Sequence, residues 1–307
     1  MAVDNVHGAS FITRRCIEIL SRAAQVYEGP EDESFRSYLV YVGRALSQAQ
    51  PAMCAPGNRI AGLLEALGTD RPDCEITGRK VEKEVKACLG LHDSELGRLG
   101  QAGAVLLAEK FREKAGIITL SHSDAVYAVL SRLAPNSQTE ITVAESRPLC
   151  EGVTLAKKLA ADGFTVNLVT DATLGIETAG ASCVLVGADT VFPDGGIINK
   201  AGTRLLALAA KMDNIPFYCC TQTCKVLPIA KEGTATLLFQ KEGDPAELIQ
   251  RPAAGIRVRN QYYDRTEYFL VSGFITERGF MRCKEIGAIS RRLAEVRDRV
   301  FGKTARE

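Results

Sequence analysis

The chain has 307 residues, of which 46% are hydrophobic and 24% are charged, and its formal net charge is +1. Such a composition is typical of a globular protein with a sizeable core, and the balanced charge argues against direct binding to nucleic acid. No apolar stretch approaches the roughly 20 residues that span a bilayer, and no basic segment leads into an apolar one near the N-terminus. We therefore expect neither a membrane span nor a signal peptide. Ten cysteines in such a chain indicate reduced thiols and a cytoplasmic protein.

Residues 1–114 show the apolar spacing of helices. Apolar residues recur at this spacing in three stretches, which begin near Ile12, Phe35 and Met53. The second stretch follows an acidic run, which suits a helix N-terminus. The segment 81–114 predicts one or two further helices, with Gly90 and Gly100 as possible breaks. We therefore expect a helical N-terminal domain over residues 1–114.

The pattern changes at Ala115, where short apolar runs begin to alternate with helical segments. The runs predicted to form strands cover residues 116–120, 141–144, 164–170, 182–186 and 215–220. Strands that alternate with helices form βαβ units, in which the strands run parallel and helices cover both faces of the sheet. We therefore expect an α/β fold with a parallel-sheet domain over residues 115–307 and a cleft between it and the helical domain.

Polar residues follow each predicted strand, and in an open parallel sheet ligands bind beyond these strand ends. They are Ser121-His122-Ser123, Glu145-Ser146-Arg147, Asp171, Asp189 and Thr221-Gln222-Thr223. Some polar residues are expected after any strand, with or without a ligand site, because strands end where polar loops begin. Arg147, together with Lys200 further along the chain, nevertheless suits an anionic ligand such as a phosphate.

The segment 187–203 joins a predicted strand to a predicted helix through a glycine-rich loop. The strand covers residues 183–187, and the helix, residues 201–212, is rich in small side chains. Backbone N–H groups of the loop and of the helix start, with the ammonium of Lys200, are thus placed where an anion can bind. No Gly-x-Gly-x-x-Gly follows the first strand and no Gly-Lys-Ser/Thr loop is present, which argues against a dinucleotide- or ATP-binding enzyme.

The sequence disfavours two other chemistries. Cys219, Cys220 and Cys224 form a cluster, but no histidine lies near them in the sequence, so we interpret them as packing at a strand end rather than as a metal site. Ser121 beside His122 suggests a nucleophile and a base. No Gly-x-Ser-x-Gly elbow surrounds this serine, which argues against a hydrolase.

Several motifs, taken in order along the chain, resemble those of one family. They are Gln50-Pro-Ala-Met53 with Asn58, Glu145-Ser-Arg-Pro-Leu-Cys-Glu-Gly152, Val169-Thr-Asp-Ala172, Gly187-Ala-Asp189, Gly195-Gly-Ile-Ile-Asn-Lys-Ala-Gly-Thr203, Ile215-Pro-Phe-Tyr218, Thr223-Cys-Lys225, Asn260 with Tyr263-Asp264, and Thr276-Glu277. On these motifs the chain resembles the family that joins the alpha, beta and delta subunits of translation initiation factor 2B to methylthioribose-1-phosphate isomerase and ribose-1,5-bisphosphate isomerase.

The resemblance implies a helical N-terminal domain, a Rossmann-like C-terminal domain and a homodimer or larger homo-oligomer, with no cofactor and no metal. The implied ligand is a phosphorylated sugar or a nucleotide-derived metabolite. Arg147 would bind a phosphate, and Asn199 with Lys200 would hold the sugar-phosphate end. The other residues that would bind the ligand are Ser123, Asp189, Gly195, Gly196 and Lys225. The residues that would build a two-fold interface are Tyr262, Tyr263, Tyr268 and Phe269.

Two departures from the family bear on catalysis. The isomerases carry a Cys after the first strand of the sheet domain, where this chain has Ser121, and an Asp in an Asn-Gly-Asp segment, where it has Gly196. Moving a proton between adjacent sugar carbons needs an acid–base pair tuned near neutral pH. Asp194 stands two residues before Gly196, about 7 Å away in an extended segment, which is beyond hydrogen-bond reach unless the loop rearranges. His122 is a further candidate for acid–base chemistry.

Three interpretations remain open. The first is a regulatory or weakly catalytic initiation-factor-2B-like protein with a phosphometabolite pocket. The sequence of residues 194–200 favours it, because this segment resembles the regulatory subunits more than the isomerases. The second is an active aldose–ketose isomerase of a phosphorylated pentose, with Ser121, His122 and Asp194 in catalytic roles. The third is a structural assembly subunit whose pocket is vestigial and binds no ligand. Retention of Arg147 and Lys200 argues against the third, although an ion pair would also explain Arg147.

Overall fold

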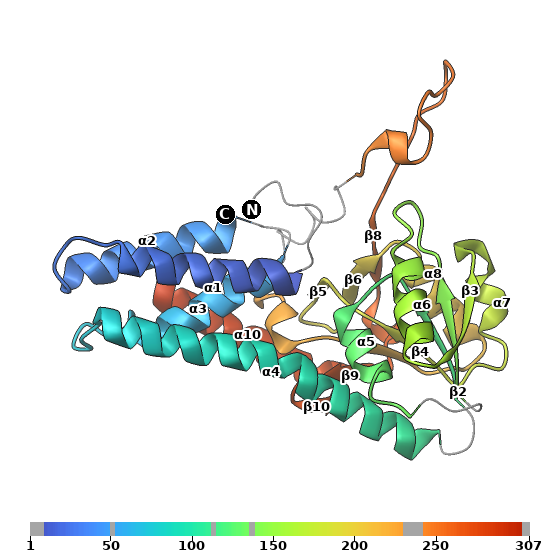
Figure 1. The fold of residues 1–307 in the computed structure, drawn as a ribbon, viewed down its shortest axis with the longest axis horizontal. Coiled ribbons are helices and arrows are strands. Elements are labelled where there is room, and N and C mark those ends of the chain that lie inside the picture. The colour runs from blue at the N-terminus through green and yellow to red at the C-terminus, as the bar shows by residue number, and fades with distance from the viewer. Residues whose placement is uncertain (1–8, 50–52, 112–114, 135–138, 230–241, 303–307) are drawn as a thin grey trace.

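The computed structural model describes residues 9–49, 53–111, 115–134, 139–229 and 242–302. A bundle of long helices lies beside a sheet that carries helices on both faces (Figure 1). The expected α/β fold with a mostly parallel sheet is confirmed.

The bundle begins with four helices. They are α1 (Ala9–Gln25), α2 (Glu33–Gln48), α3 (Cys54–Leu67) and α4 (Gly78–Lys110). Their apolar faces meet in one buried cluster around Phe35, Leu39 and Leu64. A helix from the other end of the chain, α10 (Cys283–Phe301), packs along α3 and adds Val296 and Val300 to this cluster. The helical part therefore includes α10 as well as the segment before Ala115.

Helix α4 is continuous over 33 residues, so Gly90 and Gly100 do not break it. At Gly90, which is exposed, an added Cβ would meet no atom within 4 Å. At Gly100 an added Cβ would lie 2.2 Å from the carbonyl oxygen of Ala128. Gly100 thus allows a close approach between α4 and α5 (Asp124–Leu130), and α4 can span the bundle and the sheet.

The large sheet has the strand order β10-β9-β7-β4-β1-β2-β3, and only its edge strand β10 pairs antiparallel. Its strands are β1 (Ala115–Leu120), β2 (Thr139–Ala144), β3 (Thr165–Val169), β4 (Cys183–Val186), β7 (Phe217–Cys220), β9 (Gly273–Thr276) and β10 (Gly279–Met281). The five strands expected from the sequence are present, and β9 and β10 extend the sheet beyond them.

Helices cover both faces of this sheet, as expected. One face packs against α4, α5 and α6 (Glu151–Ala161). The other face packs against α7 (Leu174–Glu177), α8 (Thr203–Met212) and α10. Because α4 and α10 belong to the bundle as well, two long helices join it firmly to the sheet.

A second, antiparallel sheet occupies the segment that the sequence suggests to be a loop. The strands β5 (Thr190–Val191) and β6 (Ile197–Lys200) form a hairpin, and β8 (Tyr263–Thr266) pairs with the other edge of β6. All four residues of β6 are buried, so the expectation of a loop here is wrong. The strand β6 therefore fixes the backbone of Asn199 and Lys200 rigidly.

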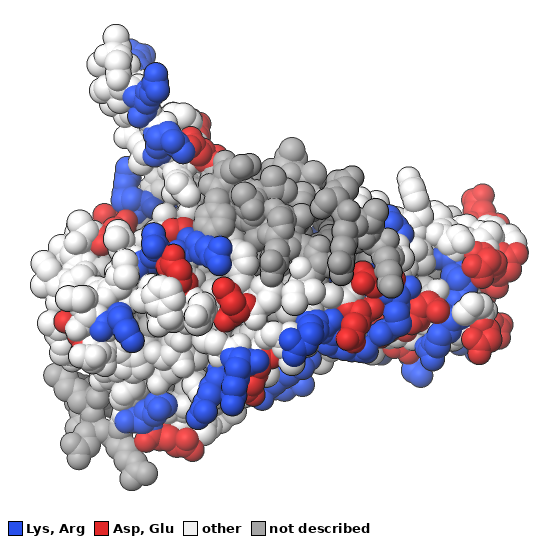
Figure 2. Space-filling model, turned by 180° about the vertical axis from the view of Figure 1, so that it is seen from behind, with Lys and Arg blue, Asp and Glu red and all other residues white. Residues whose placement is uncertain are grey.

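The surface shows no large region of one charge on the face drawn in Figure 2. Lys and Arg side chains gather along the lower edge of this view, and Asp and Glu side chains lie among them. Within the described residues, no helix is long and apolar enough to cross a membrane.

Candidate functional site

The strand order reverses between β1 and β4. From β1 the chain continues to β2 and β3 on one side and then returns to β4 on the other, and ligands bind at such a reversal of strand order. Ser123 lies in the segment after β1, and Gly187 follows β4. A Cβ on Gly187 would lie 2.5 Å from Ser123 Oγ and 3.9 Å from Asn199 Oδ1. The segments after β1 and β4 and the strand β6 therefore converge here, in what we call the β1/β4 crevice.

The ends of β1 and β2 are held in an unusual backbone conformation. Ser121 and Ser146 have φ angles of 61° and 67°, a region that residues other than glycine rarely adopt. The N–H of Ser121 donates to Ser146 Oγ (2.6 Å). The Asp171 carboxylate accepts hydrogen bonds from the N–H groups of Ser146 (2.8 Å) and Arg147 (2.7 Å). Such strained residues, fixed by surrounding bonds, cluster at functional sites.

Lys200 is a buried cation of the crevice, with 6% of its surface exposed. Its ammonium nitrogen lies 2.9 Å from Oε1 of Glu151, the first residue of α6, and 5.1 Å from the centre of the Tyr262 ring. The other carboxylate oxygen of Glu151 is buried and has no hydrogen-bond partner among the described residues. A buried acceptor without a donor is costly, so a polar ligand that donates to it would be stabilised here.

Arg147 reaches the same side of the sheet from the end of β2. Its Nη2 donates to the carbonyl oxygen of Glu247 (3.3 Å), the last residue of the short helix η4 (Pro245–Glu247). The Glu247 carboxylate accepts a hydrogen bond from the hydroxyl of Tyr262, whose ring contacts Lys200. Glu247 and Tyr262 thus connect the two cations that the sequence suggests for phosphate binding.

Lys225 is brought to the crevice by the short helix η2 (Thr223–Lys225), which follows β7. Its ammonium donates to the carbonyl oxygen of Ala188 (2.8 Å), just after Gly187. Asn58 of α3 fixes this segment, because its amide donates to the carbonyl oxygens on either side of Lys225 (both 2.8 Å). The helical bundle therefore positions a cation of the sheet domain.

Asp189 supplies a carboxylate at this point of the crevice. Its N–H donates to the carbonyl oxygen of Ile198 (2.9 Å), one residue before Asn199. Burial raises the pKa of Tyr263, and the negative charge of Asp189 raises that pKa further. Burial raises the pKa of the Cys219 thiol, and the charge of Lys225 opposes this shift while that of Asp189 adds to it. Because Lys225 donates to the carbonyl oxygen of Ala188, it lies beside the backbone of Asp189.

His122 also presents a polar atom without a partner. Its Nε2 is buried, and no described residue forms a hydrogen bond with it. Burial lowers the pKa of His122 below its ordinary value, and Asp124 and Glu151 oppose this shift with their negative charges. The imidazole is therefore neutral near pH 7 and can accept a proton or a hydrogen bond.

Asp194, Gly195 and Gly196 lie at the turn of the β5–β6 hairpin instead. Asp194 accepts a hydrogen bond from the N–H of Gly196 (2.7 Å) and lies 3.6 Å from Arg265. Gly195 has a φ angle of 94° and packs against the first residue of α10. Lys200 stands at the far end of β6, about 13 Å from Gly196 at the rise of an extended chain. These three residues therefore lie at the opposite end of β6 from Lys200.

The N-terminus of α8 is not an open anion site, in contrast to the sequence-based expectation. The Asp264 carboxylate accepts hydrogen bonds from the N–H groups of Gly202 (2.8 Å) and Arg204 (3.1 Å). These are the groups that an anion would otherwise use. Burial raises the pKa of Asp264 to about 6, although the two N–H groups oppose this shift.

The aromatic residues suggested for an interface divide into two pairs. Tyr262 and Tyr263 pack inside the subunit, the former on Glu247 and Lys200. Tyr268 and Phe269 are 50% and 61% exposed, with ring centres 5.7 Å apart. An exposed aromatic pair of this kind remains a candidate for contact with another subunit.

Four residues that hold this site together were given no role on sequence grounds. They are Asp171 as an acceptor of two N–H groups, Glu151 as the partner of Lys200, Glu247 as the partner of Tyr262, and Asn58. Asp171, Glu151 and Asn58 lie within motifs already singled out, so their positions were a usable signal. Cys219 and Cys220, in turn, pack in the cores on opposite faces of the sheet, and the described residues contain no group of His, Cys, Asp and Glu that could hold a metal.

Comparisons with known proteins agree with this architecture. The sequence profile of the Initiation factor 2 subunit family matches residues 5–283. The chain is 29% identical to a putative translation initiation factor eIF-2B subunit 2-like protein of Pyrococcus furiosus, with 92% of this chain and 93% of the relative covered. It is 27% identical to ribose 1,5-bisphosphate isomerase of Archaeoglobus fulgidus, with 89% and 85% covered. The crystal structure of translation initiation factor eIF-2B from Pyrococcus horikoshii OT3 matches with a TM-score of 0.71 at 27% identity, covering 91% of this chain and 93% of that one. Because the family profile matches nearly its whole length, this chain belongs to the Initiation factor 2 subunit family.

Proposed function

We propose that this chain is an initiation-factor-2B-like subunit whose β1/β4 crevice binds a phosphorylated sugar or a nucleotide-derived phosphometabolite, and that it is regulatory or weakly catalytic in the cytoplasm. The observation that carries the proposal is the set of contacts that link Arg147 to Lys200 through Glu247 and Tyr262, with Lys225 bound to the carbonyl oxygen of Ala188 beside Gly187. Arginine and lysine are the side chains that bind phosphate by charge-assisted hydrogen bonds.

Two buried polar atoms without partners support a sugar rather than a bare phosphate. His122 Nε2 and one oxygen of Glu151 are buried and have no partner among the described residues. Sugar hydroxyls both donate and accept hydrogen bonds, so they complement such groups. The relatives include a protein named for ribose 1,5-bisphosphate, which has both a sugar ring and phosphates.

A second function, slow aldose–ketose isomerisation of a phosphorylated pentose, is favoured by the position of Asp189. Asp189 directly follows Ala188, whose carbonyl oxygen accepts a hydrogen bond from Lys225, whereas Asp194 lies at the hairpin turn. Asp189 is therefore the better candidate for the acid that moves a proton between sugar carbons. Ser121 limits the rate, because a serine hydroxyl does not ionise near neutral pH as a thiol does.

We also propose that the chain forms a homodimer or larger homo-oligomer through the exposed pair Tyr268 and Phe269. Aromatic side chains are enriched in the buried centres of protein interfaces. Sedimentation velocity at micromolar concentration tests this proposal. We expect a dimer or larger species for the wild type and a smaller one for Phe269→Asp, and a monomeric wild type would contradict it.

The binding proposal is tested by a thermal-shift series with matched pairs of compounds. The phosphorylated members are ribose 1,5-bisphosphate, methylthioribose 1-phosphate, ribose 5-phosphate and AMP, and the unphosphorylated members are ribose, methylthioribose and adenosine. A compound that binds the folded state raises the melting temperature. We expect at least one phosphorylated compound to do so and its unphosphorylated partner not to. Proton NMR of the same mixtures detects any ketose formed.

A further inference from the structure

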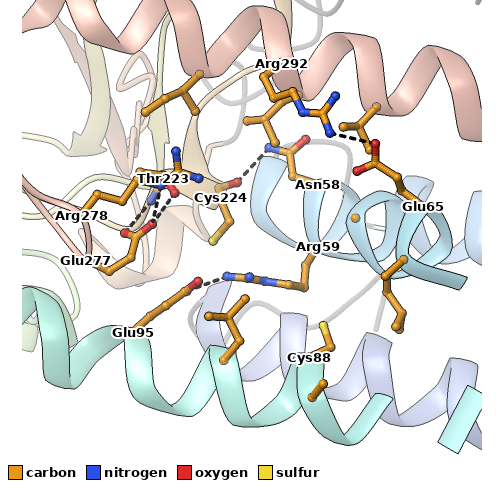
Figure 3. Close-up of a pocket in the computed structure, with 18 of the residues that line it drawn as sticks. Asn58, Arg59, Glu65, Cys88, Glu95, Thr223, Cys224, Glu277, Arg278 and Arg292 are labelled. Atoms are coloured by element: carbon orange, nitrogen blue, oxygen red, sulfur yellow. Dashed lines mark hydrogen bonds and ion pairs between the residues drawn. The ribbon is translucent and has the colours of Figure 1, made fainter. Parts of the chain in front are cut away.

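A cavity of about 570 Å³ lies between α3, α4 and α10, outside the β1/β4 crevice. Figure 3 shows its walls, with Arg59 on α3, Cys88 and Glu95 on α4, and Arg292 on α10 around the space. Pockets that bind small molecules typically measure about 300 to 1,000 Å³. None of the cations assigned above to the crevice lines this cavity.

The long walls of the cavity are apolar. They are formed by Leu63 and Ala66 of α3, Ala87 and Leu91 of α4, and Ile289, Leu293 and Val296 of α10. Leu91 is 44% exposed, which leaves a large apolar side chain open to the space. The apolar part of a ligand gains free energy when it leaves water and packs against such walls.

Gly62 keeps part of this space open. It lies in the interior of α3, where a Cβ would meet no atom within 4 Å. Glycine is the least favourable helix residue after proline, and no close packing requires it at this position. The absence of a side chain at Gly62 therefore leaves this part of the cavity empty, although glycine is unfavourable within the helix.

The polar floor of the cavity is already neutral. Arg59 and Glu95 form a buried ion pair with 2.5 Å between Nη2 and Oε2, and their side chains are 11% and 4% exposed. Glu95 Oε2 also accepts a hydrogen bond from the amide of Gln222 (2.8 Å). A ligand need not compensate the charge of Glu95.

Two arginines with spare hydrogen-bond donors stand at the sheet end of the cavity. Arg278 has only its Nε near a carboxylate, 3.8 Å from Glu277, and Glu277 itself accepts hydrogen bonds from the N–H and hydroxyl of Thr223. No carboxylate of the described residues forms an ion pair with Arg98. The acidic side chain of Glu84 lines the other end, about 21 Å from Arg98 along α4. The cavity is thus cationic at one end and apolar along its length.

We infer that this cavity binds a small organic anion with an apolar body. Its anionic group lies between Arg98 and Arg278, and its body lies along the apolar faces of α3, α4 and α10. This site shares no cation with the phosphometabolite crevice, although Asn58 lines the cavity and also holds the segment of Lys225. An arginine variant in one site is therefore a control for the other.

The test compares two fluorescent probes with the same aromatic body. 8-Anilinonaphthalene-1-sulfonate carries an anionic group, and N-phenyl-1-naphthylamine does not. We expect saturable binding of the sulfonate to one site per chain, and binding of the neutral probe at least about tenfold weaker. Arg98→Gln and Arg278→Gln should each lower the affinity for the sulfonate by about tenfold to a hundredfold, which is the usual effect of losing one charge-assisted hydrogen bond. Neither variant should change the affinity for the neutral probe. Equal affinity for the two probes, or an unchanged sulfonate affinity in both variants, overturns the inference.

A steric variant locates the site. Gly62→Leu fills the space beside α3, so we expect it to abolish binding of both probes. Gly90→Leu is the matched control, because Gly90 is also a helical glycine whose Cβ would meet no atom and it does not line the cavity. Arg147→Ala, in the crevice, leaves probe binding unchanged. Sulfonate binding that survives Gly62→Leu, or that is lost in Arg147→Ala, places the probe elsewhere and overturns the inference. The side chains of Arg98 and Arg278 are exposed, so their variants are expected to fold. They therefore test the anion site even if Gly62→Leu does not fold.

Discussion

The ammonium nitrogen of Lys200 lies 2.9 Å from Oε1 of Glu151, so a buried cation of the β1/β4 crevice is already paired with a carboxylate. A phosphate that binds beside Lys200 must share this cation with Glu151 and is repelled by it. Glu151 is therefore expected to limit the affinity of the crevice for anionic ligands. Neutral sugars do not experience this repulsion.

The substitution Glu151→Gln removes this negative charge and keeps an oxygen that Lys200 can use. We expect it to strengthen binding of ribose 1,5-bisphosphate by about tenfold, equivalent to about 1.4 kcal/mol, because Lys200 is then uncompensated. Isothermal titration calorimetry measures the change. Glu82→Gln, on the exposed side of α4, is the control and should have no effect. Unchanged binding in Glu151→Gln would show that the phosphate does not approach Lys200, and weaker binding would show that Glu151 acts as the acceptor of a sugar hydroxyl.

Arg147→Ala should weaken binding of the same phosphorylated compound by about tenfold to a hundredfold and leave the fold intact. One charge-assisted hydrogen bond to phosphate contributes about 1.5–3 kcal/mol, and the exposed Arg147 side chain supports little packing. The matched control is Arg265→Ala, an exposed arginine beside Asp194 at the hairpin turn. If both variants bind equally well, Arg147 only supports the segment around Glu247.

Ser121→Cys should produce or increase isomerisation of ribose 1,5-bisphosphate, measured as ketose by proton NMR. A thiol supplies the second acid–base group that the serine lacks, and Asp189 supplies the first. Adding Asp189→Asn to this variant should remove the gained activity. Adding Gly196→Asp should change little, because that residue lies at the hairpin turn.

Two outcomes would contradict this assignment. Rapid turnover by the unmodified protein would show that Ser121 is compatible with full catalysis. A gain of activity that needs Gly196→Asp would show that the hairpin turn reaches the substrate and that Asp189 is not the acid.

Asp264 predicts a measurable pH dependence of stability. Its pKa is raised to about 6 in the fold, mainly by burial, against about 3.9 in an unfolded chain. Between these values the folded protein holds a proton that the unfolded chain has released, so stability falls as the pH rises from about 4 to about 6. Asp264→Asn should remove up to about 1.4 kcal/mol per pH unit of this slope, measured by urea unfolding. A slope that is identical in the variant would show that Asp264 is ionised in the fold throughout this range.

The main elements of the fold were predictable because their periodicity is local. The strands from β1 to β7 of the large sheet appear as short apolar runs, and the helices as amphipathic ones. The predicted break at Gly100 was wrong because a glycine inside a helix indicates either a break or close packing. Only the close approach of Ala128 in the structure distinguishes the two. The small sheet was missed because β5 has two residues and its hairpin partner β6 is stabilised by β8, much later in the chain.

The position of a candidate residue was predictable where it follows a strand end and not where a distant segment supplies it. Arg147, Lys200 and Lys225 were suggested by motifs and strand ends, and their roles in binding remain predictions. Asp264, which occupies the N-terminus of α8, comes from a strand paired over a long separation. Asp194 was a catalytic candidate because it stands two residues before Gly196, the position of an Asp in the isomerases, and the structure places it at the other end of β6 from Lys200.

The most direct test of the central claim is a calorimetric titration of the wild-type protein with ribose 1,5-bisphosphate, methylthioribose 1-phosphate and AMP, each against its unphosphorylated counterpart. We expect saturable binding of at least one phosphorylated compound, at least about tenfold tighter than its counterpart, and a loss of that preference in Arg147→Ala. Absence of binding by all three, or equal binding of phosphorylated and unphosphorylated partners, would contradict the central claim.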